Sequence, residues 1–183
     1  LMQVFDFYYR EINRHAHLWL VGNDRGDPAY RAELERLRRS LASGDNIHMT
    51  GKISEPELYA YYRAADAFLS ASEHEGFGIP LVEAMAFDVP VIAFAAASIP
   101  EVIGDNGLLI QVWDVPQVAK LLHLYGSDVD GLHLVQLLQG QPLTRPRRAA
   151  GAGLRLVVAI EVDQDRPLRW GHGRRGDREP VVG

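Results

Sequence analysis

The chain has 183 residues, of which 47% are hydrophobic, and carries a net charge of −5. This length suits one ordinary domain with a tail and is short for two full domains. The chain contains no cysteine, which excludes a disulfide framework and any cysteine-based metal site or nucleophile. No apolar stretch approaches the about 20 residues of a membrane-spanning helix, and the first residues do not resemble a signal peptide.

The charge is distributed unevenly and marks a boundary near residue 139. Residues 1–139 carry 10 basic and 19 acidic side chains, whereas residues 140–183 carry 9 arginines and 5 acidic residues. The second segment is rich in Gly, Pro and Arg, which is typical of a poorly ordered or non-native end. Its apolar run LRLVVAIEV leaves pairing as a strand open. We therefore predict a domain over residues 1–139 and a tail over residues 140–183.

The tail could instead be an arm that binds nucleic acid or a membrane surface. Its arginines are spaced among Gly and Pro without interleaved aromatic residues. Nucleic-acid-binding segments combine positive charge with aromatic stacking or a recognisable motif. No nucleic-acid partner is therefore expected.

Helical and extended patterns alternate along the predicted domain. Tyr30, Leu34 and Leu37 recur at helical spacing, and Ser54 with Glu57 forms a capping-box pattern. The predicted helices cover residues 2–12, 28–43, 56–65 and 116–126, and another begins at Pro80. The predicted strands cover residues 17–21, 46–51, 66–72, 90–96 and 108–112.

The predicted strands are short and almost continuously apolar, as in HLWLV and PVIAFAA. Strands of this kind are buried on both faces, and their separation by helices is typical of a parallel sheet. The sequence therefore predicts an α/β fold, namely a Rossmann-like parallel sheet with helices on both faces.

The stretch SASEHEGFGIPLVEAMAF, residues 70–87, is the predicted ligand site. It follows a predicted strand, and open α/β sheets bind ligands beyond the carboxyl ends of their strands. Gly76 and Gly78 allow the backbone to approach a ligand, and Pro80 suits the first turn of a helix. The free N–H groups of that turn favour an anion such as a diphosphate.

Two glutamates, Glu75 and Glu83, flank this glycine loop. An ionised carboxylate accepts hydrogen bonds from hydroxyl groups, which suits a sugar or a ribose diol. In the alternative interpretation, Glu83 only complements the helix dipole and Glu75 is a solvated loop residue. The residues alone leave both interpretations open.

The same stretch resembles the signature of retaining glycosyltransferases with the GT-B fold, of the family-four type. The matching residues are Glu75, Gly76, Phe77, Gly78, Pro80, Glu83, Ala84, Met85 and Ala86. The resemblance to the C-terminal, nucleotide-binding domain of these enzymes extends to three flanking stretches, in order and at the expected spacing. These are HLWLVGN, NIHMTGKIS and SIPEVIGDNGLLI. The resemblance covers about residues 1–125.

The resemblance implies a role for each matching position. Glu83 would bind the ribose hydroxyls, and Glu75, the predicted catalytic residue, would contact the donor sugar. The glycine loop would meet the sugar and the diphosphate through Gly76 and the backbone amides of Phe77, Gly78 and Ile79. Ile53 and its neighbours after the second strand would lie near the base.

Two further candidates rest on the residues themselves. Lys52 is in reach of a phosphate, although a surface lysine is the default interpretation. His74 is a candidate donor contact, although a loop histidine beside two glutamates is also explained by pairing or solvation. Tyr59, Tyr61 and Tyr62 are predicted core and helix-surface residues rather than a sugar-stacking platform.

The resemblance implies transfer of a hexose from a nucleoside-diphosphate sugar to a glycan or lipid-linked acceptor, with retention at the anomeric carbon. No cofactor and no metal ion are expected. Asp128 and Asp130 match an Asp-x-Asp metal motif, but they follow a polar turn, and we interpret them as solvated. The location implied for the whole protein is cytoplasmic, with peripheral association at the inner face of the membrane left open.

Such enzymes have two Rossmann-like domains, and the sequence lacks a counterpart of the N-terminal one. The first strand of the C-terminal domain is missing too, and the chain does not begin with methionine, which indicates a fragment. The isolated chain is therefore expected to be weakly active or inactive. A non-catalytic nucleotide-sugar-binding module is the main alternative, and a glycoside hydrolase that uses Glu75 and Glu83 is a second one.

Overall fold

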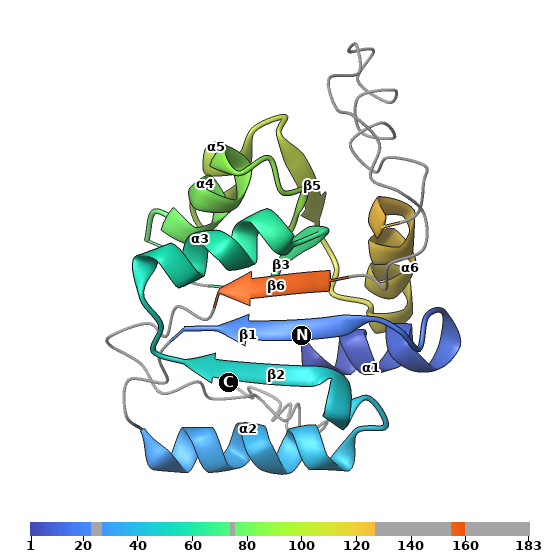
Figure 1. Cartoon of the computed structure of the whole chain (residues 1–183). Helices are drawn as coiled ribbons and strands as arrows, with labels where there is room; N and C mark the ends of the chain where they lie inside the picture. The colour runs from blue at the N-terminus through green and yellow to red at the C-terminus, as the bar shows by residue number, and fades with distance from the viewer. Residues whose placement is uncertain (23–26, 74–75, 127–154, 160–183) are drawn as a thin grey trace, which may run out of the picture.

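Six parallel strands form one sheet between two layers of helices in the computed structural model (Figure 1), which describes residues 1–22, 27–73, 76–126 and 155–159. The strands are β1 His17–Val21, β2 Ile47–Gly51, β3 Ala67–Ser70, β4 Val91–Phe94, β5 Gly107–Ile110 and β6 Arg155–Ala159. The helices are α1 Met2–Glu11, α2 Pro28–Ser40, α3 Glu55–Ala64, α4 Ile79–Ala86, α5 Ile99–Ile103 and α6 Val115–Gly126, with a 3-10 turn at Gly44–Asn46. The predicted α/β class and the alternation of elements are confirmed.

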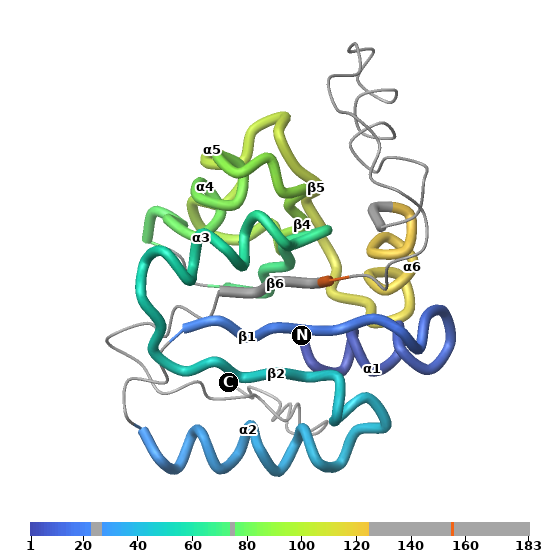
Figure 2. Tube along the Cα trace, in the orientation of Figure 1, coloured from blue at the N-terminus to red at the C-terminus, as the bar shows by residue number. Residues whose placement is uncertain are grey.

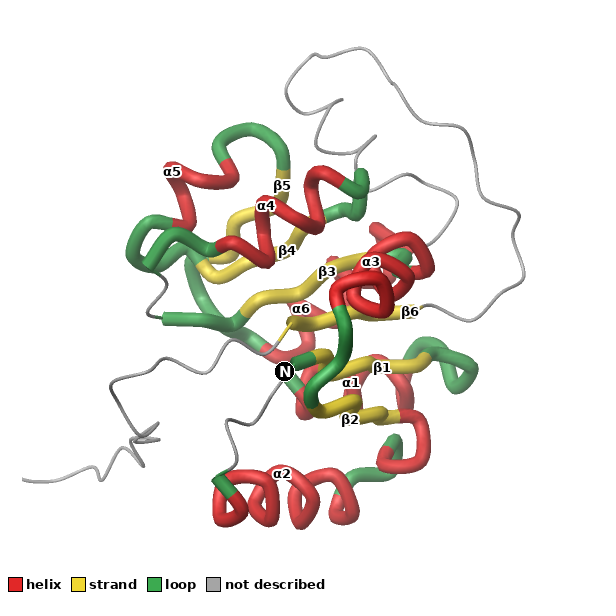
Figure 3. Tube along the Cα trace, turned by 60° about the vertical axis from the view of Figure 1, so that its left-hand side comes forward, coloured by secondary structure: helices red, strands yellow, loops and turns green. Residues whose placement is uncertain are grey.

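Helices cover both faces of the sheet (Figure 3). Alternate residues of β1 belong to opposite core clusters. Leu18 and Leu20 of β1 pack with residues of α1, α2 and α6. Trp19 and Val21 of the same strand join the cluster formed by α3, α4 and α5. This alternation explains why the strand sequences read as continuous apolar runs, since each side chain of the strand lies under a helix layer.

The predicted capping box at the start of α3 is confirmed, and α2 begins at a cap that the sequence analysis did not name. Asp27 caps α2 by accepting hydrogen bonds from the backbone N–H groups of Ala29 and Tyr30, at 2.9 and 3.1 Å. In the capping box of α3, the backbone N–H of Ser54 donates to Glu57 Oε2 at 2.8 Å. Within the described ranges, no helix combines the length and the apolar character that a membrane span requires.

The order of the strands is β2-β1-β6-β3-β4-β5. Doubly wound sheets commonly have the order 3-2-1-4-5-6, in which the strand nearest the N-terminus occupies the third position. Here β6, near the C-terminus, occupies that position, and it pairs with β1 on one side and β3 on the other. Figure 2 shows the chain passing from β2 through α3 to β3, beyond both β1 and β6.

The tail predicted over residues 140–183 therefore supplies one strand of the sheet. The sequence left the pairing of LRLVVAIEV open, and five of its residues are β6. The remainder of that segment, and the boundary near residue 139, lie outside the described residues.

Asp66, which immediately precedes β3, holds the start of β6. Its Oδ2 accepts hydrogen bonds from the backbone N–H of Arg155 at 2.7 Å and from Arg155 Nε at 3.3 Å. The backbone N–H of Asp66 donates to the carbonyl of Arg155 at 2.8 Å. This exchange fixes the register between β6 and β3 at the point where both strands begin.

Candidate functional site

The loops that follow β2, β3 and β4 all emerge at the carboxyl edge of the sheet, because the strands are parallel. Most of the predicted ligand residues belong to the loop after β3 and to α4, and Lys52 and Ile53 follow β2. Two strands, β1 and β6, lie between β2 and β3. At about 4.8 Å per strand, the two groups of residues emerge roughly 14 Å apart, which suits opposite ends of an extended ligand.

Gly78 begins α4 in a left-handed conformation, with φ of 74°. Its carbonyl accepts hydrogen bonds from the N–H groups of Leu81 and Val82, at 3.0 and 3.3 Å. Pro80 has no N–H, and the N–H groups of Leu81 and Val82 are already paired with the carbonyl of Gly78. The backbone amides of Phe77, Gly78 and Ile79 have no acceptor among the described residues, and they are the ones available to an anion.

The loop after β4 supports the glycine loop from one side. The hydroxyl of Ser98 donates to the carbonyl of Gly76 at 2.8 Å. Ser98 is the N-cap residue of α5, and the preceding Ala97 has a positive φ of 48°, which is uncommon for a residue other than glycine. The bond therefore joins two loops at neighbouring strand ends and fixes the carbonyl orientation at the start of the glycine loop.

Glu83 is half-buried on α4 and accepts a hydrogen bond from the hydroxyl of Tyr62 at 3.0 Å. The helix begins at Ile79, so Glu83 lies at the start of its second turn. Tyr62 belongs to α3 and is fully buried. The sequence analysis counted Tyr62 among core and helix-surface residues without assigning it a polar partner. Only the packing of α3 against α4 brings the two side chains together.

The other predicted site residues divide into two groups. Glu75 and His74 lie outside the described residues. Lys52 is exposed after β2, and Ile53 packs against the core cluster of α3, α4 and α5. Phe77 and Ile79 are exposed apolar side chains beside the glycine loop, with 65% and 55% of their surface accessible.

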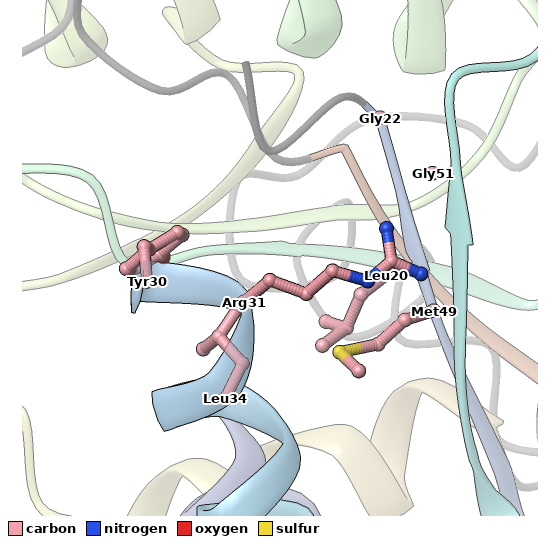
Figure 4. Close-up of a pocket in the computed structure, with 7 residues that line it drawn as sticks. All are labelled: Leu20, Gly22, Tyr30, Arg31, Leu34, Met49 and Gly51. Atoms are coloured by element: carbon pink, nitrogen blue, oxygen red, sulfur yellow. The ribbon is translucent and has the colours of Figure 1, made fainter. Parts of the chain in front are cut away.

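A small pocket lies at the carboxyl ends of β1 and β2, against α2 (Figure 4). Its lining residues come from these three elements and the turns after the strands: Leu20, Gly22, Tyr30, Arg31, Leu34, Met49 and Gly51. Figure 4 shows the Arg31 side chain extending from α2 toward the two strands. The sequence analysis missed Arg31, because nothing in its local pattern distinguishes it from the other arginines of the same helix.

No group of three or more His, Asp or Glu side chains that could hold a metal ion occurs within the described ranges. Two histidines do meet across neighbouring strands, away from the glycine loop. Nδ1 of His17 and Nε2 of His48 lie 3.1 Å apart, and the ring of Trp19 stacks on His48 with centroids 5.0 Å apart. Asp128 and Asp130 lie outside the described residues.

The histidine pair predicts a pH dependence of stability. Burial lowers the pKa of His48, and the positive charges of His17 and Arg38 act in the same direction. The unfolded chain therefore binds the proton more readily, and the free energy of unfolding should decrease as the pH falls below about 6.5 and level off below the folded-state pKa. Because the ring is only half-buried, we expect a loss of less than about 1 kcal/mol.

Urea unfolding at pH 7.5 and 5.5 measures this effect. In the His48→Gln variant the difference between the two pH values should be smaller than in the original chain. His15→Gln, which changes an exposed histidine outside the pair, should leave the difference unchanged. An identical pH dependence in the His48→Gln and original chains would contradict the prediction.

The parallel sheet, its doubly wound order and the loop at its carboxyl edge define a Rossmann-like α/β domain. Residues 2–125 match the family model of the glycosyl transferases group 1. The chain belongs to this family, as the resemblance of the glycine loop and its flanking stretches predicted.

Several relatives share this part of the chain. The chain is 33% identical over 96 residues to the MMP alpha-(1->4)-mannosyltransferase of Mycolicibacterium hassiacum, covering 52% of this chain and 23% of the relative. It is 40% identical over 73 residues to the O-antigen chain mannosyltransferase B of Escherichia coli, covering 40% and 19%. It is 29% identical over 144 residues to the D-inositol 3-phosphate glycosyltransferase of Thermomonospora curvata, covering 77% and 30%. The chain thus spans less than a third of these relatives.

Two solved structures share the fold. The C-terminal domain of LpcC, a glycosyl transferase group 1 protein of Francisella tularensis, aligns with a TM-score of 0.51 and 26% identity, covering 76% of this chain and 79% of that domain. TarM aligns with a TM-score of 0.57 and 20% identity, covering 76% of this chain and 27% of TarM. The fold is therefore that of the C-terminal half of a GT-B glycosyltransferase, as predicted.

Proposed function

We propose that this domain binds the nucleoside-diphosphate sugar donor of a retaining hexosyltransferase. The observation that carries the proposal is the position of Glu83. It lies half-buried on α4, is held by Tyr62, and follows a glycine loop whose amides are available to an anion. An acceptor-only carboxylate beside an anion site is suited to a ligand that joins a ribose diol to a diphosphate.

The proposed ligand extends along the carboxyl edge of the sheet. Glu83 accepts hydrogen bonds from the ribose hydroxyls, and the amides of Phe77, Gly78 and Ile79 bind the diphosphate. Lys52 and Ile53 lie toward the base. The family resemblance assigns Glu75 to the donor sugar as the catalytic residue, and His74 beside it is a further candidate donor contact.

Catalysis in this proposal depends on orienting the donor and stabilising the departing diphosphate. Backbone amides at a helix start are fixed donors, so they stabilise the charge that develops on the leaving group without reorganising. The residues assigned here do not include a paired general acid and base. We propose no cofactor and no metal requirement for this chemistry.

The whole protein would transfer the hexose to a glycan or a lipid-linked acceptor. The acceptor would be bound mainly by an N-terminal GT-B domain outside this chain. Two of the similar proteins are mannosyltransferases by name, and one of them acts on the O-antigen chain, which supports a polysaccharide or lipid-linked acceptor. We propose a cytoplasmic location, with peripheral association at the inner face of the membrane where the acceptor is lipid-linked.

Calorimetric titration of the chain with a panel of nucleoside diphosphates and their hexose conjugates tests the proposal. Glu83→Ala should weaken binding of the best ligand about 10- to 100-fold. Each hydrogen bond to a charged group contributes about 1.5–3 kcal/mol, and a tenfold change in affinity corresponds to about 1.4 kcal/mol.

Glu11→Ala is the matched control, because Glu11 is an exposed carboxylate at the end of α1, in the opposite helix layer. This variant should bind as the original chain does. Equal affinities of the Glu83→Ala and original chains would overturn the ribose assignment. Donor binding by the full-length protein without any transfer or hydrolysis would favour a non-catalytic binding module.

A further inference from the structure

Tyr62 connects the core to the proposed ligand site. Its side chain is 0% exposed, and its hydroxyl lies 3.0 Å from Glu83 Oε2 and 3.4 Å from the carbonyl of Pro80. A hydroxyl has one hydrogen to donate. The shorter distance and the negative charge of the acceptor both favour donation to Glu83.

The packing around Tyr62 fixes where its hydroxyl lies. The ring stacks on Phe87 with centroids 5.6 Å apart and planes at 13°, and it contacts Phe68 at 6.1 Å. The backbone N–H of Phe87, the C-cap residue of α4, donates to the carbonyl of Glu83 at 3.1 Å. The side chains of Glu83 and Phe87 are four residues apart and therefore lie on the same side of the helix end. Tyr62 therefore lies across both residues, with its ring on Phe87 and its hydroxyl on Glu83.

This arrangement restrains the Glu83 carboxylate before any ligand binds. A carboxylate has two oxygens and about four acceptor positions, and Tyr62 occupies one of them. The second oxygen, Oε1, accepts no hydrogen bond from a described residue. A group held in its binding orientation loses less conformational entropy when the ligand arrives, which raises affinity.

We propose that Tyr62 is a positioning residue, whose hydroxyl fixes one oxygen of Glu83 so that the carboxylate presents its remaining acceptor positions to the ribose hydroxyls of a nucleoside diphosphate. The inference rests on the proposed assignment of Glu83 to the ribose. It extends that assignment by naming what orients the carboxylate and by predicting selectivity for ribose over 2′-deoxyribose.

If Tyr62 had only a structural role in the core, its substitution would change the ligand affinities in a different way. If Tyr62 only stabilised the packing of α3 on α4, its removal would weaken all ligands equally through a less stable domain. If it orients Glu83, its removal should act on the one part of the ligand that Glu83 contacts. The ratio of affinities for ribose and 2′-deoxyribose ligands separates the two roles.

The test compares Tyr62→Phe with Tyr59→Phe. Both tyrosines lie on α3 and pack on Phe87, at 5.6 and 5.1 Å between ring centroids, but the hydroxyl of Tyr59 donates to Glu55 instead. The probes are UDP and GDP with their 2′-deoxy counterparts, titrated calorimetrically into the full chain. Thermal unfolding of each variant shows that it is folded at the titration temperature.

In the original chain we expect the ribose ligand to bind about tenfold more tightly than the 2′-deoxy ligand. Tyr62→Phe should weaken the ribose ligand about three- to tenfold and the 2′-deoxy ligand much less, so that the ratio falls. Tyr59→Phe should leave the ratio unchanged. In a Glu83→Ala background, Tyr62→Phe should have no further effect on either ligand.

Phe87→Leu gives a second measurement that does not depend on the folding of Tyr62→Phe. It removes the ring that Tyr62 stacks on and leaves both polar groups in place, so the ratio should fall in the same direction by a smaller factor. An unchanged ratio in Tyr62→Phe and Phe87→Leu, together with a weakened Glu83→Ala, overturns the positioning role and leaves the ribose assignment standing. An unchanged Glu83→Ala overturns both.

Discussion

A chain that ends after Gln139 is expected not to fold cooperatively. The shortened chain lacks β6, which lies between β1 and β3 in the sheet. Without it the sheet divides into β2-β1 and β3-β4-β5. A two-stranded piece is only marginally stable in water, and the two pieces would expose unpaired strand edges in the middle of the core. The free energy of unfolding of a domain is about 5–15 kcal/mol. We expect the loss of β6 to remove most of it.

Urea unfolding followed by circular dichroism tests this prediction on three chains. A chain of residues 1–159, which keeps β6, should unfold cooperatively, whereas residues 1–139 should not. In the full chain, Val157→Pro should cost about 3 kcal/mol or more, because proline removes a ladder donor from a strand that is paired on both sides. A 1–139 chain with the same unfolding midpoint and slope as the full chain would show that β6 is not part of the stable sheet.

The five strands within residues 1–126 were predictable because their signals are local. HLWLV and PVIAFAA are apolar runs bounded by turn residues, and each observed strand lies inside or within one residue of its predicted range. The starts of α2 and α3 follow from Pro28 and the Ser54–Glu57 capping box, which depend on contacts within one helical turn.

The place of β6 was not predictable in the same way. Its sequence has strand character, but it lies in a segment whose composition is typical of a tail. Strand propensity says nothing about which edges a strand will join. The partner strands β1 and β3 lie far before β6 in the sequence, so no local pattern connects them to it. Only the assembled sheet determines that choice.

The candidate site, like the fold, was predictable from the sequence only in part. The glycine loop and Glu83 are part of one continuous stretch, so their association with a strand end and a helix start was readable from the sequence. Tyr62 lies 21 residues before Glu83, on another helix. The sequence pattern of α3 indicated only a core or helix-surface position for Tyr62. The partner of its hydroxyl depends on how α3 packs against α4. Ser98, which holds Gly76, was missed for the same reason.

Gly78→Val should destabilise the domain by about 2–4 kcal/mol and weaken binding of the proposed donor. Gly78 has a φ of 74°, and a β-branched residue is strained in this left-handed region by at least about 1–2 kcal/mol. An added Cβ would also lie 2.9 Å from Leu81 Cδ1, so this buried side chain of α4 would have to shift. Because Gly78 starts the helix, relief of the strain would displace the amides of Phe77 and Ile79 from the anion site.

Gly76→Val is the matched control, since Gly76 lies in the same loop, has no positive φ, and no atom lies within 4 Å of the Cβ position. It should change the free energy of unfolding by less than about 0.5 kcal/mol. Thermal and urea unfolding give the stability of each variant, and titration with the best ligand of the nucleotide panel gives its affinity below both unfolding transitions. Equal stabilities of the two variants would show that the left-handed turn is not required to start α4. A destabilised Gly78→Val that still binds with the original affinity would show that the diphosphate does not depend on the amides of this turn.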